Sequence, residues 1–309
     1  MLLVAALTWL IAVPVNAFSG AAKVASAPSG ARPAQQPGTL YLMVGSDSRE
    51  GMTAAEKKKL GTGTVAGGRT DTIILLYVPL TGKPVMISVP RDSYVAIPGH
   101  GKNKINASYA IGGAALLIQT IEQATGLRVD HYVEIGFEGF AGLVDAVGGV
   151  DVCLSKPMND AKAHINLPKG CQTLDGAKAL GYVRARYSDP LGDLGRVQRQ
   201  REIVSKIISK AATPATILNP VRYWKLTHAA ADAIALGDDT GLLSMPRFAL
   251  AMRAISRSDG YTLTVPVATA SLQTPNAGIA VQWDETKAKA LFADLARGDT
   301  SDVAKYVTK

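Results

Sequence analysis

Short apolar runs alternate with amphipathic segments along most of this 309-residue chain. Apolar runs closed by glycine, proline or charge predict strands, whereas apolar residues that recur every three to four positions predict helices. The expected strands are 40–45, 72–78, 84–89, 131–135, 150–154, 181–186, 261–266 and 279–283. The expected helices are 114–125, 138–147, 175–180, 193–212, 221–235, 244–256 and 284–297. This mixed order predicts a single α/β sandwich domain over residues 39–309.

The N-terminal segment differs from the rest. Residues 1–18 (MLLVAALTWLIAVPVNAF) are apolar and uncharged, close to the roughly 18 to 20 residues that cross a bilayer. They predict a transmembrane signal anchor, and the alternative is a cleaved signal peptide. Residues 19–38 are rich in Ala, Pro, Ser, Gly and Gln, which predicts a flexible linker. Either interpretation of the first 18 residues places the remainder outside the cytoplasm.

Composition narrows the class of partner. The chain has 33 Lys and Arg against 25 Asp and Glu, a net charge of +8 that suits a polyanion. Aromatic residues make up only 6%, and no basic block is interleaved with aromatic residues, so nucleic acid is disfavoured. Cys153 and Cys171 are the only cysteines. In an exported chain they predict one disulfide, worth about 3 kcal/mol, and the alternative is two buried thiols.

Charged residues gather where the first strands end. Asp47 follows the strand 40–45, and Arg91 with Asp92 follows the strand 84–89, whereas Arg69 and Asp71 precede the strand 72–78. If the middle strand runs antiparallel to the other two, these charges meet at one edge of the sheet, as an active site requires. Arg184 and Arg186 are two apart in the expected strand 181–186, so they should share one face.

Arg196 is the most informative single residue. A projection of 193–212 at 100° per residue places it in line with Gln200, Ile203 and Ile207, the stripe that should face the core. A buried cation is costly without a partner, and the first turn of a helix favours an anion, so an anionic ligand satisfies both. Arg199 and Arg201 project elsewhere and are expected to be solvated.

The residue types indicate phosphate chemistry. Guanidinium groups bind phosphate oxygens in bidentate fashion, and five arginines suit a pyrophosphate. Carboxylates among them would repel that ligand unless a hard cation bridges the two, so Mg²⁺ (or Mn²⁺) is the expected cofactor. Phosphoryl transfer needs mainly positioning and charge neutralisation. The plain alternative is a set of surface ion pairs, which fits Arg196 poorly. No P-loop, serine-hydrolase elbow or metal-binding histidine spacing is present in the sequence.

Several motifs in order resemble the LytR-CpsA-Psr family over about 40–205. The matching segments are YLMVGSDSR, GGRTDTIILLYV, ISVPRDSYVAIPGHGKNKINASYAIGG, VDHYVEIGFEGFAGLVDAVGGVDV and LDGAKALGYVRARYSDPLGDLGRVQRQREIV. The resemblance implies an α/β/α sandwich whose mixed central sheet and helices enclose a hydrophobic tunnel for a polyprenyl chain. One departure is Ala107-Ser108, where a histidine often follows the KIN run, so that turn is given no catalytic role.

The resemblance also implies roles for individual residues. Asp47 and Asp71 look like the residues that serve the metal and acid/base chemistry, with Arg69 and Arg91 as their catalytic neighbours. The remaining assignments are a pyrophosphate clamp of Arg69, Arg91, Arg184, Arg186 and Arg196 with Gln200 in support, and weaker candidates Lys104, Asn106 and Asp193.

The implied function is a phosphotransferase that moves a glycopolymer from a polyprenyl-pyrophosphate carrier to peptidoglycan. The expected partners are that donor, the peptidoglycan acceptor and the membrane, without nucleic acid. Arabinogalactan, teichoic acid and capsule would all present the same pyrophosphate, and the Ala-rich composition with its cysteine pair favours an actinobacterial arabinogalactan. The alternatives are a lipid pyrophosphatase that releases phosphate without an acceptor, and a non-catalytic envelope regulator or lipid-carrier binding protein.

Overall fold

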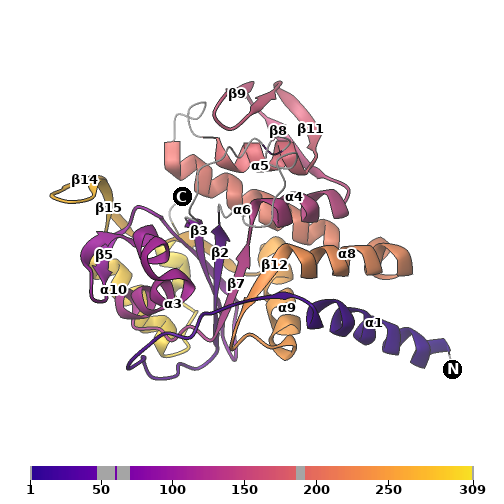
Figure 1. Ribbon diagram of the computed structural model, residues 1–309, viewed down its shortest axis with the longest axis horizontal. Coiled ribbons are helices and arrows are strands. Elements are labelled where there is room, and N and C mark those ends of the chain that lie inside the picture. The colour runs from indigo at the N-terminus through magenta and orange to yellow at the C-terminus, as the bar shows by residue number, and fades with distance from the viewer. Residues whose placement is uncertain (1, 47–59, 61–69, 186–191, 308–309) are drawn as a thin grey trace. The chain divides into compact units, whose positions relative to one another are not determined.

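The computed structural model describes residues 2–46, 60, 70–185 and 192–307 (Figure 1). The contacts divide the chain into two compact units. The first unit consists of Met1–Ala22, Ser48–Ala66 and Ile135–Ala235, and the second of Lys23–Asp47, Gly67–Glu134 and Leu236–Lys309. They are called unit 1 and unit 2 below. The sequence predicts one domain over 39–309, whereas each of these units has a hydrophobic core of its own.

Groups of helices and groups of strands follow one another along the described chain. The helices are α1 Leu2–Ser19, α3 Ile105–Thr125, α4 Phe137–Ala146, α5 Gly176–Arg184, α6 Gly192–Ala211, α7 Pro214–Ile217, α8 Pro220–Ala233, α9 Met245–Ser256 and α10 Glu285–Ala296, with 3₁₀ turns η1 Leu242–Ser244 and η2 Val303–Tyr306. The strands are β1 Ala22–Val24, β2 Thr39–Ser46, β3 Thr70–Val78, β4 Val85–Val89, β5 Tyr94–Ile97, β6 Gly101–Lys104, β7 His131–Ile135, β8 Val150–Leu154, β9 Met158–Asp160, β10 Ile165–Leu167, β11 Gly170–Leu174, β12 Ile234–Gly237, β13 Tyr261–Thr264, β14 Val267–Thr274 and β15 Gly278–Trp283.

A seven-stranded mixed sheet organises unit 2. Its order is β1-β12-β7-β2-β3-β4-β13. β3 runs antiparallel to both β2 and β4, whereas β13 is parallel to β4. On one face of the sheet, Leu42 of β2 lies in a buried core that includes residues of α3 and α10. Residues on this face alternate along each strand with residues on the other face, as expected for the period of two. On the other face Tyr41 lies 5.3 Å from Phe248 of α9, measured between ring centroids.

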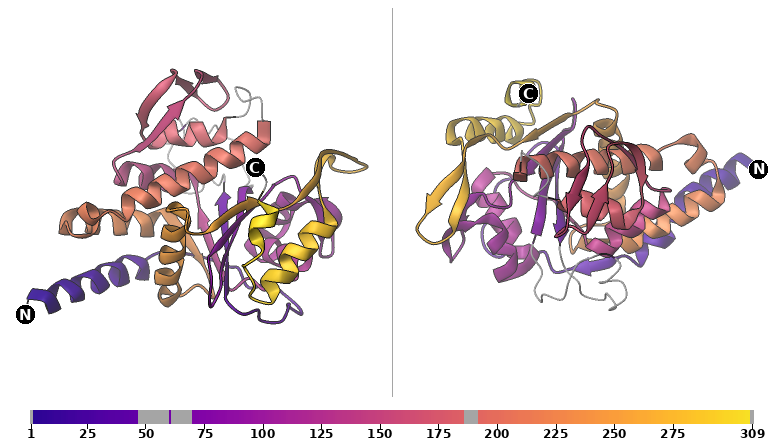
Figure 2. Two further views of the ribbon diagram at one scale, coloured as in Figure 1. Left: turned by 180° about the vertical axis from the view of Figure 1, so that it is seen from behind. Right: turned by 90° about the horizontal axis from the view of Figure 1, so that it is seen from above.

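This arrangement confirms the expected α/β/α sandwich with a mixed central sheet (Figures 1 and 2). The hydrophobic tunnel stays a prediction. The expected helix 114–125 is the second part of α3, which begins earlier and is interrupted at Gly112 and Gly113. Gly113 has φ +62° and Gly126, the C-cap, has φ +71°, conformations that glycine adopts without strain.

Unit 1 has a smaller core. Helices α4, α5 and α6 pack with β8 to β11 around Val144, Leu180 and Ile203. β8 and β11 pair antiparallel, which places Cys153 opposite Cys171, and the two form the predicted disulfide. Helix α4 approaches α8 closely at Gly139. A Cβ at this position would lie 2.3 Å from the carbonyl oxygen of Ala233 in α8, so only glycine fits there.

The expected strand 181–186 is wrong. Residues up to Arg184 belong to α5, whose N-cap Asp175 accepts a hydrogen bond from the backbone N–H of Lys178. The N-cap and the burial of Ala179, Leu180 and Val183 on the helix favour a helix despite the strand-forming residues Tyr and Val. The inference that Arg184 and Arg186 share one face of a strand therefore fails, and Arg186 lies outside the described residues.

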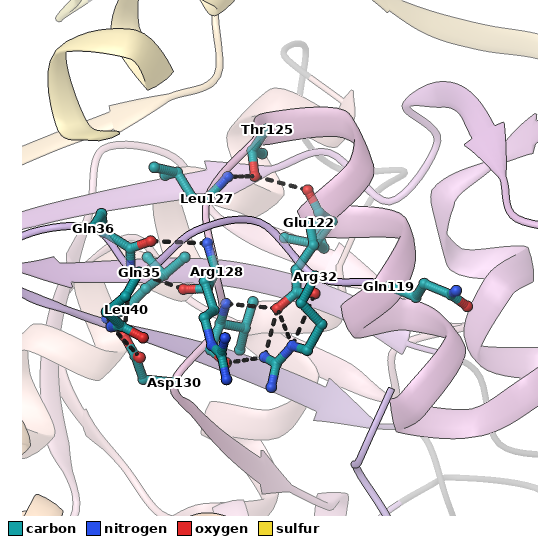
Figure 3. A network of polar contacts seen from close by, with 12 residues as sticks. Arg32, Gln35, Gln36, Leu40, Gln119, Glu122, Thr125, Leu127, Arg128 and Asp130 are labelled. Atoms are coloured by element: carbon teal, nitrogen blue, oxygen red, sulfur yellow. Dashed lines mark hydrogen bonds and ion pairs between the residues drawn. The ribbon is translucent and has the colours of Figure 1, made fainter. Parts of the chain in front are cut away.

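The segment expected to be a flexible linker makes many contacts within unit 2 (Figure 3). Arg32 forms an ion pair of 2.6 Å with Glu122, which is 3% exposed. The hydrogen bond to the Glu122 carboxylate is the main reason that the pKa of Arg32 is raised. Gln35 and Gln36 donate hydrogen bonds to Asp130. Residues 22–38 are therefore not the flexible linker that their composition predicts. Their polar side chains form hydrogen bonds and an ion pair with residues distant in the sequence, which composition alone does not reveal.

Among the residues that the structure describes, no helix has the length and apolar character needed to cross a membrane.

Candidate active site

Three strand ends share one edge of the unit 2 sheet. Ser46, the last residue of β2, pairs with Thr70, the first of β3, and Val89 at the end of β4 pairs with Ile73. The middle strand is therefore antiparallel, as the convergence of charges requires. Asp47 and Arg69 lie outside the described residues, as does the side chain of Asp71, so their roles stay predictions.

Arg91 lies in a turn held by backbone contacts. Ser93 donates from its N–H and its hydroxyl to the carbonyl of Pro90, at 3.0 and 2.6 Å. The Ser93 hydroxyl also accepts from Nε1 of Trp283, at 2.8 Å. The start of α3 closes on the same turn, since the Asn106 N–H donates to the Arg91 carbonyl at 3.2 Å. The weaker candidate Asn106 is thus a neighbour of Arg91 through its backbone.

The charges around this turn form a compact cluster. Asp92 lies 3.6 Å from Arg91 and 3.3 Å from Lys104, both measured between charged atoms. All three side chains are largely buried. The structure therefore places the weaker candidate Lys104 beside Arg91, with Asp92 between them. Asp92 was not proposed as a site residue, although its position directly after Arg91 in the sequence could have suggested a positioning role.

A buried hydrogen-bond chain lies at the same end of the sheet. Glu134 of β7 is 9% exposed and accepts hydrogen bonds from the hydroxyls of Tyr109 and Tyr132, at 2.8 and 2.7 Å. Burial raises the pKa of Tyr109 and Tyr132, and the nearby Glu134 carboxylate adds to the shift. A hydrogen bond with Ser46 connects Tyr109 to the end of β2. This chain of hydrogen bonds was not predicted from the sequence, in which a lone glutamate in an apolar strand was the available signal.

The predicted arginines Arg184 and Arg196 belong to unit 1, on α5 and α6. Arg184, in the last turn of α5, lies over the ring of Phe137, 4.8 Å from its centroid. Arg196 of α6 is 3% exposed and shares its face with the buried Ile203 and Ile207, which confirms the position predicted from helical periodicity. Gln200 is half-buried, and the side chain of Asp193 lies outside the described residues.

Arg199 is not the solvated residue that the helical projection predicts. It is 6% exposed, and its guanidinium donates to the carbonyl oxygens of Tyr182 and Ala185, at 3.1 and 2.5 Å. These carbonyls belong to the C-terminal end of α5, where helical partners run out. Arg199 therefore caps the helix that carries Arg184. Arg201 is also partly buried, and burial lowers its pKa.

The described residues contain no group of three or more His, Cys, Asp or Glu side chains that could hold a metal ion. The expected metal ligands, Asp47 and Asp71, are not among the side chains that the structure describes. The Mg²⁺ or Mn²⁺ site therefore stays a prediction.

The profile of the LytR_cpsA_psr family matches residues 16–296. The chain therefore belongs to this family, and the match extends well beyond the motifs at 40–205. The chain is 48% identical over 259 residues to the "Probable cell wall biosynthesis protein LcpB" of Corynebacterium glutamicum, covering 84% of this chain and 61% of that protein.

Two further similarities come from a relative and a solved structure. Over 161 residues the chain is 42% identical to the "Polyisoprenyl-teichoic acid--peptidoglycan teichoic acid transferase TagU" of Oceanobacillus iheyensis, 48% of each chain. It thus spans about half to three fifths of the length of these curated relatives. The "LytR-Csp2A-Psr enzyme from Actinomyces oris" has the same fold, with a TM-score of 0.70 at 23% identity over 89% of this chain and 96% of that one.

Proposed function

We propose that this protein is a phosphotransferase that moves a glycopolymer from a polyprenyl-pyrophosphate donor to peptidoglycan. The observation that carries the proposal is the shared edge of β2, β3 and β4. The Arg91, Asp92 and Lys104 cluster follows β4 at this edge, where β2 ends just before Asp47 and where β3, which contains Asp71, begins just after Arg69. Family membership and a relative named as a teichoic acid transferase support the same reaction class.

The reaction is a single displacement at phosphorus. A hydroxyl of a peptidoglycan sugar attacks the sugar-proximal phosphorus, and the bond to the bridging oxygen of the pyrophosphate breaks. Polyprenyl phosphate leaves with the bond electrons, and the glycan stays joined to peptidoglycan by a phosphodiester. Asp47 or Asp71 accepts the proton of the attacking hydroxyl. Arg69, Arg91, Arg184, Arg186 and Arg196 offset the charge of the pyrophosphate, with Gln200 as a polar contact and Lys104, Asn106 and Asp193 close to the head group.

Mg²⁺ or Mn²⁺ would supply charge neutralisation between the carboxylates and the pyrophosphate oxygens. Oxygen donors suit either ion, and Asp47 and Asp71 are the residues proposed to hold it. Titration of Mg²⁺ against the metal-free protein, followed by calorimetry, tests this independently of turnover. Binding that persists in the Asp47→Ala/Asp71→Ala protein would contradict the assignment.

The protein is proposed to act at the outer side of the cytoplasmic membrane, with residues 1–18 as the anchor. Envelope location is supported by the cell wall biosynthesis relative and by the Cys153–Cys171 disulfide, since such bonds persist in oxidising compartments. Arabinogalactan is the proposed polymer, because the 48% identical relative comes from an actinobacterium. Competition between purified donors of different glycan type would decide among polymers.

The direct test is transfer in vitro. The full chain is mixed with a labelled polyprenyl-pyrophosphate saccharide, peptidoglycan and Mg²⁺, and label joined to peptidoglycan through a phosphodiester is measured. The wild type is expected to transfer label, Asp71→Ala to lose transfer, and Arg184→Ala to bind the donor more weakly. Full activity in Asp71→Ala would remove that residue from catalysis. Cleavage of the donor that does not need peptidoglycan would instead favour a pyrophosphatase, and donor binding without any cleavage a carrier-binding protein.

A further inference from the structure

The first turns of α3 contact the ends of three strands of the unit 2 sheet. The N–H of Asn106 donates to the Arg91 carbonyl, at 3.2 Å, in the turn that follows β4. The hydroxyl of Tyr109, in the next turn of the helix, donates to Glu134 of β7, at 2.8 Å, and shares a hydrogen bond with Ser46, the last residue of β2. One short segment of α3 thus joins β2, β4 and β7 at the edge where the candidate site residues gather.

β7 runs parallel to β2, so the two strands end at the same edge of the sheet. They are neighbours in the strand order, and they begin side by side at Asp130 and Leu40. The Asp130 N–H donates to the Leu40 carbonyl at 2.9 Å, and the Asp130 carboxylate accepts from the Leu40 N–H at 2.8 Å. Glu134 therefore lies near the end of β2. Tyr132, on the same face of β7, donates to the second carboxylate oxygen of Glu134, at 2.7 Å.

The hydrogen bonds form a chain that begins at Ser46 and ends at Glu134. A phenol hydroxyl has a single hydrogen, and Tyr109 gives it to the carboxylate of Glu134. The Tyr109 oxygen is therefore the acceptor toward the hydroxyl of Ser46, which is 0% exposed. Such a buried chain is stable only when each of its members is satisfied. The position of the Ser46 side chain is thus set by Tyr109, and that of Tyr109 by Glu134.

Ser46 lies at a β-bulge that contains Asp71. Along β2 and β3, Gly45 pairs with Thr72, whereas Ser46 pairs with Thr70. Asp71 is therefore the extra residue on β3, outside the ladder of paired residues. A bulge bends the strand and re-aims its side chains, and bulges are common beside active sites. In a regular register Ser46 would pair with Asp71 itself, so the position of Ser46 decides whether Asp71 belongs to the ladder.

We propose that Tyr109 and Glu134 are positioning residues that hold Ser46 in the bulged register and thereby place the two carboxylates of the proposed acid/base chemistry. Asp71 occupies the bulge, and Asp47 is the residue after Ser46. This role rests on the proposed function, in which one of these carboxylates takes the proton of the acceptor hydroxyl. Loss of the chain disturbs the spacing of the two aspartates and removes none of the arginines proposed to bind the pyrophosphate. The expected signature is a lower kcat at an unchanged KM for the donor.

Hydrogen exchange tests the positioning without donor or acceptor. Tyr109→Phe keeps the ring and removes the hydroxyl between Ser46 and Glu134. Exchange in peptides that cover the end of β2 and the start of β3 should quicken about five- to tenfold, the effect of one lost hydrogen bond on local opening. The matched control is Tyr41→Phe, since Tyr41 is a buried tyrosine of the same strand whose hydroxyl donates to the Ser244 carbonyl, at 2.8 Å. It should leave exchange in these peptides unchanged. Equal exchange there in the two variants would overturn the proposal.

Transfer kinetics measure the consequence for the reaction. Tyr109→Phe should lower kcat about 10- to 100-fold, because small displacements of reacting groups are costly. The KM for the polyprenyl-pyrophosphate donor should stay within about twofold, since its proposed ligands are unchanged. Tyr41→Phe should change neither constant. A KM that rises while kcat is unaffected, or a kcat no lower than that of Tyr41→Phe, would overturn the positioning role.

Glu134 allows a test by conservative rescue. Glu134→Leu leaves the hydroxyls of Tyr109 and Tyr132 without their acceptor and should reproduce the kinetic and exchange effects of Tyr109→Phe. Glu134→Gln keeps an accepting oxygen and adds an amide donor, so the chain can form again and kcat should stay within about threefold of the wild type. A folded Glu134→Gln protein as slow as Glu134→Leu would overturn the proposal. If Glu134→Leu does not fold, Tyr109→Phe decides alone, because it retains the ring and the carboxylate.

The two kinds of measurement separate this inference from the proposed function. If the wild type transfers no glycan but Tyr109→Phe, unlike Tyr41→Phe, quickens exchange at the ends of the strands, the chain holds the bulge and the proposed function fails. If the wild type transfers glycan and Tyr109→Phe equals it in both kcat and exchange, the positioning role fails and the proposed function stands.

Discussion

The two units hold their site cations in different ways. In unit 2, Arg91 and Lys104 share the carboxylate of Asp92, and the backbone around Arg91 is fixed by contacts from Pro90 and Asn106. In unit 1, Arg199 donates to main-chain carbonyls and Arg184 lies on the face of an aromatic ring. The described contacts of Arg91 and Lys104 are thus with a carboxylate at a turn, and those of Arg184 and Arg199 include an aromatic ring and main-chain carbonyls on helices. Replacement of Arg199 in unit 1 should therefore affect folding and ligand binding together.

The largest expected effect is at Arg196 of unit 1, which is 3% exposed. Arg196→Met is expected to lower transfer by about 100- to 1,000-fold, because a donor aimed at the pyrophosphate is lost. Any loss in the free energy of unfolding should stay below about 3 kcal/mol, because an apolar side chain of similar length keeps the packing of the buried face. Urea denaturation and transfer assays measure both. Retained transfer with a loss of about 3 kcal/mol in stability would identify a structural ion pair instead.

The second largest expected effect is the loss of the disulfide, which lies in unit 1 and should affect the stability of that unit alone. Replacement of Cys153 and Cys171 by serine should lower the stability of unit 1 by about 3 kcal/mol, because the unfolded chain regains the freedom of the closed loop. Hydrogen exchange should quicken in β8, β11 and α6 but stay unchanged in β2, β3 and β4. Equal acceleration in both sets of strands would show that the units unfold as one.

Arg199 tests the capping of α5. Arg199→Met leaves the carbonyls of Tyr182 and Ala185 without their donor, and the free energy of unfolding should fall by about 2 kcal/mol. Donor affinity should fall as well, because Arg184 ends the same helix. Arg201→Met is the matched control on α6. It should not lower stability, since burial already disfavours that charge and lowers its pKa. A stability loss as large as that of Arg199→Met would contradict the distinction.

The smallest expected effect is the change in the stability of unit 2 with pH that His131 causes. Burial lowers the pKa of His131, so the folded state binds a proton less readily than the unfolded chain. The stability from this group is complete above about pH 6.5 and declines as pH falls from there toward the lowered pKa. The decline should be small, because the ring keeps access to solvent. His131→Gln should flatten it in denaturation curves between pH 5 and 7. A stability that rises on acidification would contradict the sign.

The sequence predicted most elements because their signals are local. The periodicity of 193–212 located Arg196 on the buried face of α6, and glycine marked the end of α3 at Gly126. The apolar runs 72–78 and 84–89 lie within one residue or two of β3 and β4. A pair of cysteines in an exported chain predicted the disulfide between β8 and β11. Each of these inferences needs only neighbours along the chain and the geometry of one helix or strand.

Tertiary structure decided what depends on partners distant in sequence. Strand-forming residues in GYVR became the end of α5, because the N-cap at Asp175 and burial of the helix outweigh local propensity. Arg199 is buried because it reaches carbonyls of the preceding helix, a contact that no projection of α6 alone contains. Arg32 found Glu122 ninety positions away, and Asp92 joined Arg91 to Lys104. The sequence alone determined which cations exist and, for Arg196, which helix face it occupies. Their partners depend on how strands and helices meet in space.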